Sequence, residues 1–365
     1  MSEKVRIADI GDYLKVFACT AVMMQPTISL VLATNPSHHT QAILRVIYNL
    51  VKYTAPAFIF GILYTTTRTN EGAKLENYPK YMRGTWSSLF VPSFWWTLVY
   101  LLVMPWVQQV QAYHNAGSFI WNFFNGNAAP HLWYNTMMLQ FILLMFLFWW
   151  LARFVDGRPK RGFVVALITI IFYLFWLYFY SHTASHGNWY LLDRFFVSFI
   201  IYGIFGVLAV KFSSSVNTWL AKLWPLALLV LVVSFGWTNF ELHSFGYPVS
   251  LINAGYYKPS MTLYSLAVIA SVAGLCLFNT RHHHDRFLKV IHYLANFAYK
   301  AYLSNIFWLQ IVWWLTGRHQ LHSAHPICSL LLCWIFTWLL SFMSAVGINQ
   351  LWSRLKNLYR TSPGR

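Results

Sequence analysis

The feature that most constrains this chain is a succession of apolar stretches, each long enough to cross a lipid bilayer as a helix. A spanning helix needs roughly 20 mostly apolar residues. The 365 residues are 58% hydrophobic and only 10% charged, whereas soluble domains carry about 25% charged residues. A soluble fold of this composition would expose large apolar patches that aggregate. The sequence therefore predicts an integral membrane protein whose immediate partner is the lipid bilayer.

We predict an all-α fold, a polytopic transmembrane bundle of about ten spans. Helices are expected because backbone groups in lipid must hydrogen-bond within their own segment. The runs are too long and too continuously apolar for barrel strands, which alternate. One domain covers residues 1–365, with a basic tail over 353–365. The predicted spans are 13–33, 43–66, 86–107, 131–152, 163–181, 190–210, 219–237, 261–279, 297–315 and 327–352.

Basic residues fall on alternate connections between the spans, which indicates the orientation of the chain. Loops rich in Lys and Arg stay on the cytoplasmic side, so we place both termini in the cytoplasm and the protein in the plasma membrane. The net charge of +17 does not predict a nucleic-acid partner, because the basic residues are scattered rather than gathered on one face. The basic connections contain Arg68, Lys74, Lys80, Arg83, Arg153, Arg158, Lys160, Arg161, Lys211, Lys222, Arg281, Arg286 and Lys289.

Histidines and cysteines are present, but their spacing does not predict a metal site. The four cysteines lie inside apolar segments and read as small buried hydrophobes. The histidines at 282–284 have Arg and Lys neighbours, which disfavour a cation. Those at 182–186 and 319–325 have no carboxylate or cysteine nearby. We therefore predict no metal and no bound cofactor.

Five charged residues interrupt the apolar segments, namely Lys15, Lys52, Asp193, Arg194 and Lys300. A basic residue at the centre of a span costs roughly 2.5–3.5 kcal/mol, so it usually faces a cavity or a partner. Lys15 can instead reach the membrane surface with its long side chain, and Asp193 and Arg194 can pair with each other. Lys52 and Lys300 lie deeper, and we expect both to face a polar interior. The scarcity of carboxylates in the spans disfavours an ion-coupled transporter.

His131 opens the fourth predicted span in the sequence Pro130-His131-Leu132-Trp133-Tyr134. Its position beside aromatic residues fits the interfacial belt of a membrane protein, which is the structural interpretation. The functional interpretation is a polar group that holds a substrate or takes a proton, since an unperturbed histidine titrates near neutrality.

Several segments, in their order along the chain, resemble the acyltransferase-3 family of integral membrane acyltransferases. The resemblance covers nearly the whole length, and HLWY at 131–134 is its most specific part. The other segments are DYLKVFA at 12–18, TAPAFIFG at 54–61, KYMR at 80–83 with FVP at 90–92, DRFF at 193–196, YGIFG at 202–206 and AYKAYLSN at 298–305.

The resemblance implies transfer of an acyl group, often acetyl, from a cytoplasmic donor to a hydroxyl of a surface glycan or a lipid-linked sugar. The donor implied is an acyl-coenzyme A, acetyl-CoA foremost, acting as a co-substrate. Relatives in the polysaccharide-intercellular-adhesin group are associated with glycan modification or export, which makes glycan-synthesis machinery a further expected partner.

The chain departs from the family at its first span, which normally carries an arginine and, after ten further residues, a histidine. Here the basic residue is Lys15, and the histidine position falls at Gln25 or Pro26. A glutamine amide accepts no proton at physiological pH, although Gln25 can orient a substrate or stabilise an oxyanion. The late motif, which often ends in histidine, ends here in Asn305.

The leading interpretation is a membrane O-acyltransferase with His131 as the base and Gln25 beside it. Lys15 and Arg83 would bind the anionic donor from the cytoplasm. The alternatives are a catalytically silent relative that exports or flips a glycan or lipid, and a scaffold within a glycan-synthesis complex. The remaining residues expected to contact substrate or donor are Lys52, Trp133, Tyr134, Arg194, Lys300, Tyr302 and Asn305.

Overall fold

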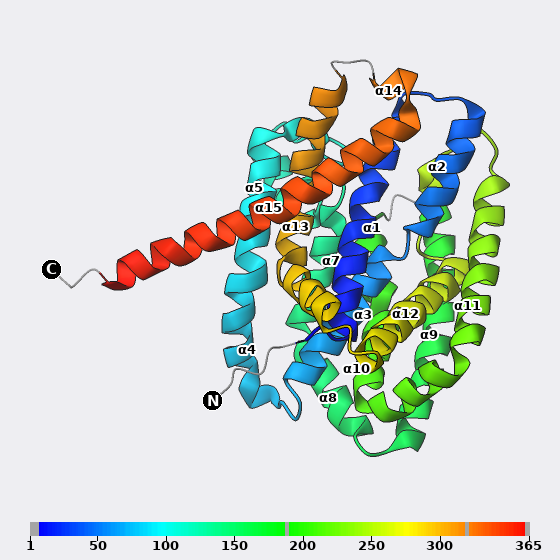
Figure 1. The fold of residues 1–365 in the computed structure, drawn as a ribbon, viewed down its shortest axis with the longest axis vertical. Helices are drawn as coiled ribbons and strands as arrows, with labels where there is room; N and C mark the ends of the chain where they lie inside the picture. The colour runs from blue at the N-terminus through cyan, green and yellow to red at the C-terminus, as the bar shows by residue number, and fades with distance from the viewer. Residues whose placement is uncertain (1–6, 187–189, 318–320, 362–365) are drawn as a thin grey trace.

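The computed structural model describes residues 7–186, 190–317 and 321–361, and these residues form a bundle of helices without a strand (Figure 1). Two 3-10 turns, Tyr190–Arg194 and Phe196–Phe199, precede α10, and a π-helical turn, Trp86–Phe90, joins α4 to α5. The helices are α1 Ile10–Ala33, α2 His38–Leu50, α3 Thr54–Thr69, α4 Tyr78–Thr85, α5 Val91–Val103, α6 Ala116–Asn125, α7 Leu132–Leu143, α8 Met145–Val155, α9 Pro159–His186, α10 Ile200–Lys211, α11 Ser213–His243, α12 Pro259–Arg281, α13 Asp285–Gly317, α14 Leu321–Ala324 and α15 Pro326–Thr361.

Seven helical segments of the described chain are long and apolar enough to cross a membrane, and the number becomes eight if α7 and α8 form one bent span. The all-α membrane fold is thus confirmed, and the predicted number of about ten was approximate. Two predicted spans are not among these segments. The 190–210 span contains a helix of only 12 residues, α10. The 297–315 span lies inside α13, whose first half is polar, with Asp285, Arg286 and Lys289.

Helix α1 lies at the centre of the bundle and contacts α3, α12, α13 and α15 (Figure 1). Its core-facing side chains include Tyr13, Leu14 and Met23, all fully buried. By contrast, α9 and α11 expose large apolar side chains over much of their surface, such as Phe175 and Val232. Apolar surface of this extent is what a lipid environment requires of a peripheral helix.

The two ends of the bundle differ in charge. We call upper the end at which α1 finishes, α2 begins and α14 lies, and lower the end at which α1 begins and α4 lies (Figure 1). The basic connections at residues 68–83 and 153–161 lie at the lower end. The predicted orientation requires the lower end to face the cytoplasm, and this sidedness stays a prediction.

Two segments lie at the periphery. Residues 118–124 belong to α6, which Asn115 caps by accepting a hydrogen bond from the Ser118 amide at 2.8 Å. Residues 353–361 of the basic tail belong to α15, which continues to Thr361 and projects from the bundle (Figure 1). Residues 362–365 lie outside the described chain.

Candidate active site

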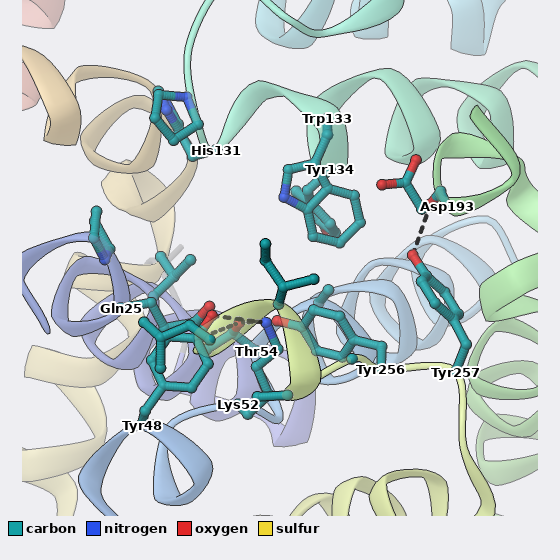
Figure 2. Close-up of a pocket in the computed structure, with 18 of the residues that line it drawn as sticks. Gln25, Tyr48, Lys52, Thr54, His131, Trp133, Tyr134, Asp193, Tyr256 and Tyr257 are labelled. Carbon is teal, nitrogen blue, oxygen red and sulfur yellow. Dashed lines mark hydrogen bonds between the residues drawn. The ribbon is translucent and has the colours of Figure 1, made fainter. Parts of the chain in front are cut away.

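A cavity of about 710 Å³ lies within the bundle, and Figure 2 shows residues that line it. It is bounded by the second half of α1, the junction of α2 with α3, the beginning of α7, and the segment 251–258 that precedes α12. Pockets of roughly 300–1,000 Å³ are typical of small-molecule sites, so this cavity has the volume of a binding site.

The floor of the cavity is built on a break in the second predicted span. Helix α2 ends at Leu50 and α3 begins at Thr54, so residues 51–53 form a turn. Gln25 on α1 bridges this turn, because its amide nitrogen donates to the Val51 carbonyl at 2.8 Å and to the Thr54 hydroxyl at 2.9 Å. Irregular backbone within a membrane protein is tolerated where it is buried in protein or lines a cavity.

Lys52 lies in this turn and lines the cavity with only 9% of its surface exposed. Its ammonium nitrogen donates to the Tyr48 hydroxyl at 3.0 Å. The same nitrogen lies 4.8 Å from the ring centroid of Tyr48 and 4.3 Å from that of Tyr256. Aromatic faces attract a cation within about 6 Å, so two rings partly offset the burial of the charge.

His131 immediately precedes α7, is buried, and lines the same cavity from another side (Figure 2). Its Nε2 lies 3.3 Å from the Leu303 carbonyl oxygen, while its buried Nδ1 has no partner within the described residues. A carbonyl oxygen only accepts, so Nε2 carries the hydrogen and Nδ1 carries the free lone pair of the neutral ring. His131 therefore presents an unused proton acceptor.

Two tyrosines hold this histidine in place. The Tyr302 hydroxyl donates to the His131 carbonyl, and the rings of Tyr302 and Tyr100 meet the imidazole edge-on, with centroids at 5.0 and 5.3 Å. The Tyr100 hydroxyl also donates to the Leu303 carbonyl at 2.8 Å and accepts from the Phe307 amide at 3.2 Å. It is thus inserted into one turn of α13, where it aligns the carbonyl that fixes the tautomer of His131.

Aromatic side chains form the remaining wall, which we call the aromatic wall and define as Trp133, Tyr134, Tyr180, Tyr256 and Tyr257. The Trp133 ring lies 5.7 Å from that of Tyr256, and the rings of Tyr180 and Tyr257 lie 4.1 Å apart, measured between centroids. The buried Tyr134 hydroxyl has no hydrogen-bond partner within the described chain. The wall therefore offers ring faces to a ligand, while the Tyr134 hydroxyl is enclosed by protein.

Asp193 lines the cavity and forms an ion pair with Arg194, as predicted, at 3.1 Å. Arg194 itself lies behind the wall, where it also donates to Gln109 at 3.0 Å and to Asn127 at 2.7 Å. The Tyr257 hydroxyl donates to the Asp193 backbone carbonyl at 2.9 Å (Figure 2). Arg194 thus positions lining residues and does not itself line the cavity.

The structure brings together six of the residues that the sequence indicated. Five others lie elsewhere, including Arg194. Lys15 pairs with Asp12 at 3.5 Å near the lower end, and Arg83 is exposed on α4. Lys300 donates to Asn349 on α15 at 2.5 Å, and Asn305 is buried outside the cavity. The six residues that line the cavity are Gln25, Lys52, His131, Trp133, Tyr134 and Tyr302.

The family model described as an acyltransferase domain matches residues 11–348, which is nearly the whole chain. The protein belongs to the acyltransferase-3 family. Neither the search of curated proteins nor the search of solved structures gave a match. Family membership supports a membrane acyltransferase, in agreement with the order of motifs along the sequence.

This acyltransferase-3 protein has site residues that the sequence interpretation missed. Tyr48 precedes Lys52 by four residues, a spacing that places two side chains on one helix face, so it could have been found. Thr54 begins α3, and its hydroxyl lies 3.1 Å from that of Tyr256. Tyr256 and Tyr257 follow a long polar connection, and the sequence carried no signal that this connection folds over the cavity.

Within the described chain, no group of three His, Cys, Asp or Glu side chains is placed to hold a metal ion. His284 bonds to Asn279 at 2.7 Å, and His322 bonds to Thr316 at 2.8 Å. His319 and the side chain of His186 lie outside the described residues.

Proposed function

We propose that this acyltransferase-3 protein is an O-acyltransferase of the plasma membrane, with both termini in the cytoplasm. It transfers an acyl group, acetyl foremost, from a cytoplasmic acyl-CoA to a hydroxyl of a cell-surface or lipid-linked carbohydrate. The observation that carries the proposal is His131, a buried histidine with an unused proton acceptor at the edge of a ligand-sized cavity.

In this mechanism, His131 is the general base. The acceptor hydroxyl donates to Nδ1 and loses its proton as its oxygen attacks the thioester carbonyl of the donor. A carbon–oxygen bond forms, the carbon–sulfur bond breaks, and the proton on His131 passes to the departing thiolate. The Nε2–H group keeps its hydrogen bond to the Leu303 carbonyl throughout, so the protonated ring is stabilised by the bond that oriented it.

The aromatic wall supports a carbohydrate acceptor. A sugar presents C–H groups on its ring faces and hydroxyls at its edges. Binding sites that suit such ligands combine aromatic surface with a few fixed polar groups. Trp133 and Tyr256 supply the surface, while Asp193 supplies polar atoms.

The donor is proposed to approach from the lower end. The phosphates of coenzyme A match cationic side chains, Arg above all. Arg83 is exposed on α4 and can meet a phosphate. Lys15 is less available to a phosphate, because its ammonium group already forms an ion pair with Asp12 at 3.5 Å. Asp12 is also bonded to His292 at 2.7 Å.

Gln25 is proposed to support the site rather than to take part in the chemistry. Its amide nitrogen has two hydrogens, and the Val51 carbonyl and the Thr54 hydroxyl accept both. An oxyanion would therefore find no free donor on this amide. The family's usual histidine position falls at Gln25 or Pro26, and this departure supports the second candidate function, export or flipping of a glycan or lipid without catalysis.

The test replaces His131 by Gln, which keeps a donor for the Leu303 carbonyl but removes the base. Turnover in proteoliposomes supplied with acetyl-CoA and a glycan acceptor should fall by about 10²–10⁴-fold. His114→Gln, at an exposed histidine of the predicted outer surface, is the matched control and should acylate normally. Full turnover by the His131→Gln protein would show that His131 is not the general base. No acylation by the unmutated protein, with several acyl donors and acceptors, would favour the second function.

A further inference from the structure

The charged side chains that line the cavity do not balance. Asp193 is paired with Arg194, and Lys258 is paired with Glu241 at 2.6 Å. Among the residues that the structure describes, no carboxylate lies within ion-pair distance of Lys52. The ammonium form of Lys52 therefore has no negative partner in the described part of the cavity. A buried charge is costly unless it is paired, which makes a ligand of opposite charge the natural complement.

The hydroxyls around Lys52 are also arranged as donors. The Thr54 hydroxyl oxygen accepts from the Gln25 amide, so its own hydrogen is free to donate to the Tyr256 hydroxyl, 3.1 Å away. Because the Thr54 oxygen can also accept a second hydrogen bond, the bond between Thr54 and Tyr256 can run in either direction, and an anionic ligand selects the direction that leaves the hydrogen of Tyr256 for the cavity. Tyr48 accepts from the Lys52 ammonium, so its hydrogen is left for the cavity. The Val51 carbonyl, an obligatory acceptor, fixes the amide nitrogen of Gln25.

Lys52, Tyr48 and Tyr256 thus form a cluster that presents hydrogens and few lone pairs, which we call the donor cluster. The ammonium group has three hydrogens, and Tyr48 takes one of them. The N-terminus of α3 adds to the field, since Thr54 and Ala55 line the cavity and no side chain caps this helix. A helix N-terminus favours negative charge. A neutral sugar hydroxyl both donates and accepts, whereas an anionic oxygen only accepts.

We infer that the acceptor carries an acidic group, a phosphate, a pyrophosphate or a carboxylate, that binds to the donor cluster while a hydroxyl of the same molecule reaches His131. This inference rests on the proposed function and narrows its substrate class from carbohydrates in general to acidic carbohydrates or sugar phosphates. The cavity is lined by both His131 and Lys52 (Figure 2), so one ligand can contact the base with its hydroxyl and the donor cluster with its anion.

The experiment measures binding to the full-length protein in nanodiscs of zwitterionic lipid, by calorimetry, without an acyl donor. The probes are glucose, glucose 6-phosphate and glucuronate. The unmutated protein should bind at least one of the two anionic sugars about 10-fold or more tightly than glucose, since hydrogen bonds to charged groups are the stronger ones. Equal affinity for all three probes would overturn the inference, and which anion binds more tightly identifies the acid.

Variants locate the anion. Lys52→Met should weaken binding of the anionic sugar by about 10²-fold, the scale of losing one partner of a buried charge pair, and should leave glucose binding unchanged. Lys222→Met, which removes an exposed lysine of α11, is the control for net charge and should bind like the unmutated protein. Tyr256→Phe keeps the ring near Lys52 but removes a hydrogen-bond donor, and should weaken binding of the anionic sugar by about 10-fold. It replaces Lys52→Met if that protein does not fold.

Coenzyme A is the last probe, because its phosphates share this chemistry. Loss of coenzyme A binding in Lys52→Met, with no binding of either anionic sugar to the unmutated protein, would assign the anion to the donor and overturn the inference. Selective binding of an anionic sugar by a protein that shows no acyl transfer would uphold the site and overturn the proposed function instead. The two failures are therefore distinguishable.

Discussion

Gly206 marks a close approach between α10 and α3, the helix whose first residues reach the cavity. A Cβ atom at this position would lie 2.7 Å from the Phe60 carbonyl oxygen and 3.2 Å from the Tyr64 amide nitrogen. Both are backbone atoms of α3, so no side-chain rotation relieves the contact. We therefore expect Gly206→Ala to force α10 and α3 apart.

The magnitude follows from two opposing contributions. Forcing extra volume into a packed interior typically costs about 1–3 kcal/mol. Replacing glycine by alanine within a helix raises the free energy of unfolding by roughly 0.5–1 kcal/mol, because alanine loses less conformational freedom on folding. The backbone contact is short, so the packing cost exceeds the gain. The net expectation is a loss of about 1–2 kcal/mol in the free energy of unfolding.

Two matched controls isolate the contact from the change of residue. Gly236 on α11 and Gly274 on α12 are also helical glycines, and a Cβ at either would meet no atom within 4 Å. The same substitution there should stabilise the protein by roughly 0.5–1 kcal/mol. The assay is reversible unfolding in mixed micelles titrated with sodium dodecyl sulfate. If Gly206→Ala were as stable as the two controls, the tight crossing of α3 and α10 would be refuted.

Two further predictions use other parts of the molecule. With Cys328 replaced by serine, a membrane-impermeant thiol reagent applied from outside should label a cysteine at Asn115 and spare one at Asn77, both exposed sites; the reverse pattern would invert the topology. Burial lowers the pKa of His322, whose ring stacks on Trp313 with centroids 3.5 Å apart. The unfolded chain therefore takes up more protons as the pH falls, and stability should drop below about pH 6.5. His322→Gln should show a smaller drop between pH 7.5 and 5.5, and an unchanged drop would show that this histidine does not sense pH.

The sequence predicted the helices well, because a helix that faces lipid requires a continuous run of apolar residues, which is visible in the sequence. It did not predict the breaks between them. Residues 43–66 read as one span, yet the chain turns at 51–53, where Gln25 bonds to the Val51 carbonyl from 26 residues away. Likewise the start of the 190–210 span is not α-helical, because Arg194 is held by Gln109 and Asn127. Such long-range partners leave no trace in local hydropathy.

The candidate site was predictable where a residue was out of place in an apolar segment. Lys52 was identified on that ground, and His131 by its place at the start of a span and by its motif; both line the cavity. The same reasoning also selected Lys300, whose Asn349 partner lies on a helix much later in the chain. A charge in a span indicates that a polar partner exists, but its sequence position does not say whether that partner is a neighbouring helix or a cavity.

At both polar centres of the site, a side chain from another helix bonds to the backbone. Lys52 stands in the turn between α2 and α3, and the carbonyl that orients His131 belongs to the turn of α13 into which Tyr100 is inserted. Backbone groups must be satisfied inside a membrane, and here Gln25 and Tyr100 satisfy them. The side chains that bond to these backbone groups therefore also hold polar groups of the cavity in place. The proposed base and the donor cluster are positioned before any substrate arrives, which is the condition under which fixed polar groups are most effective in catalysis.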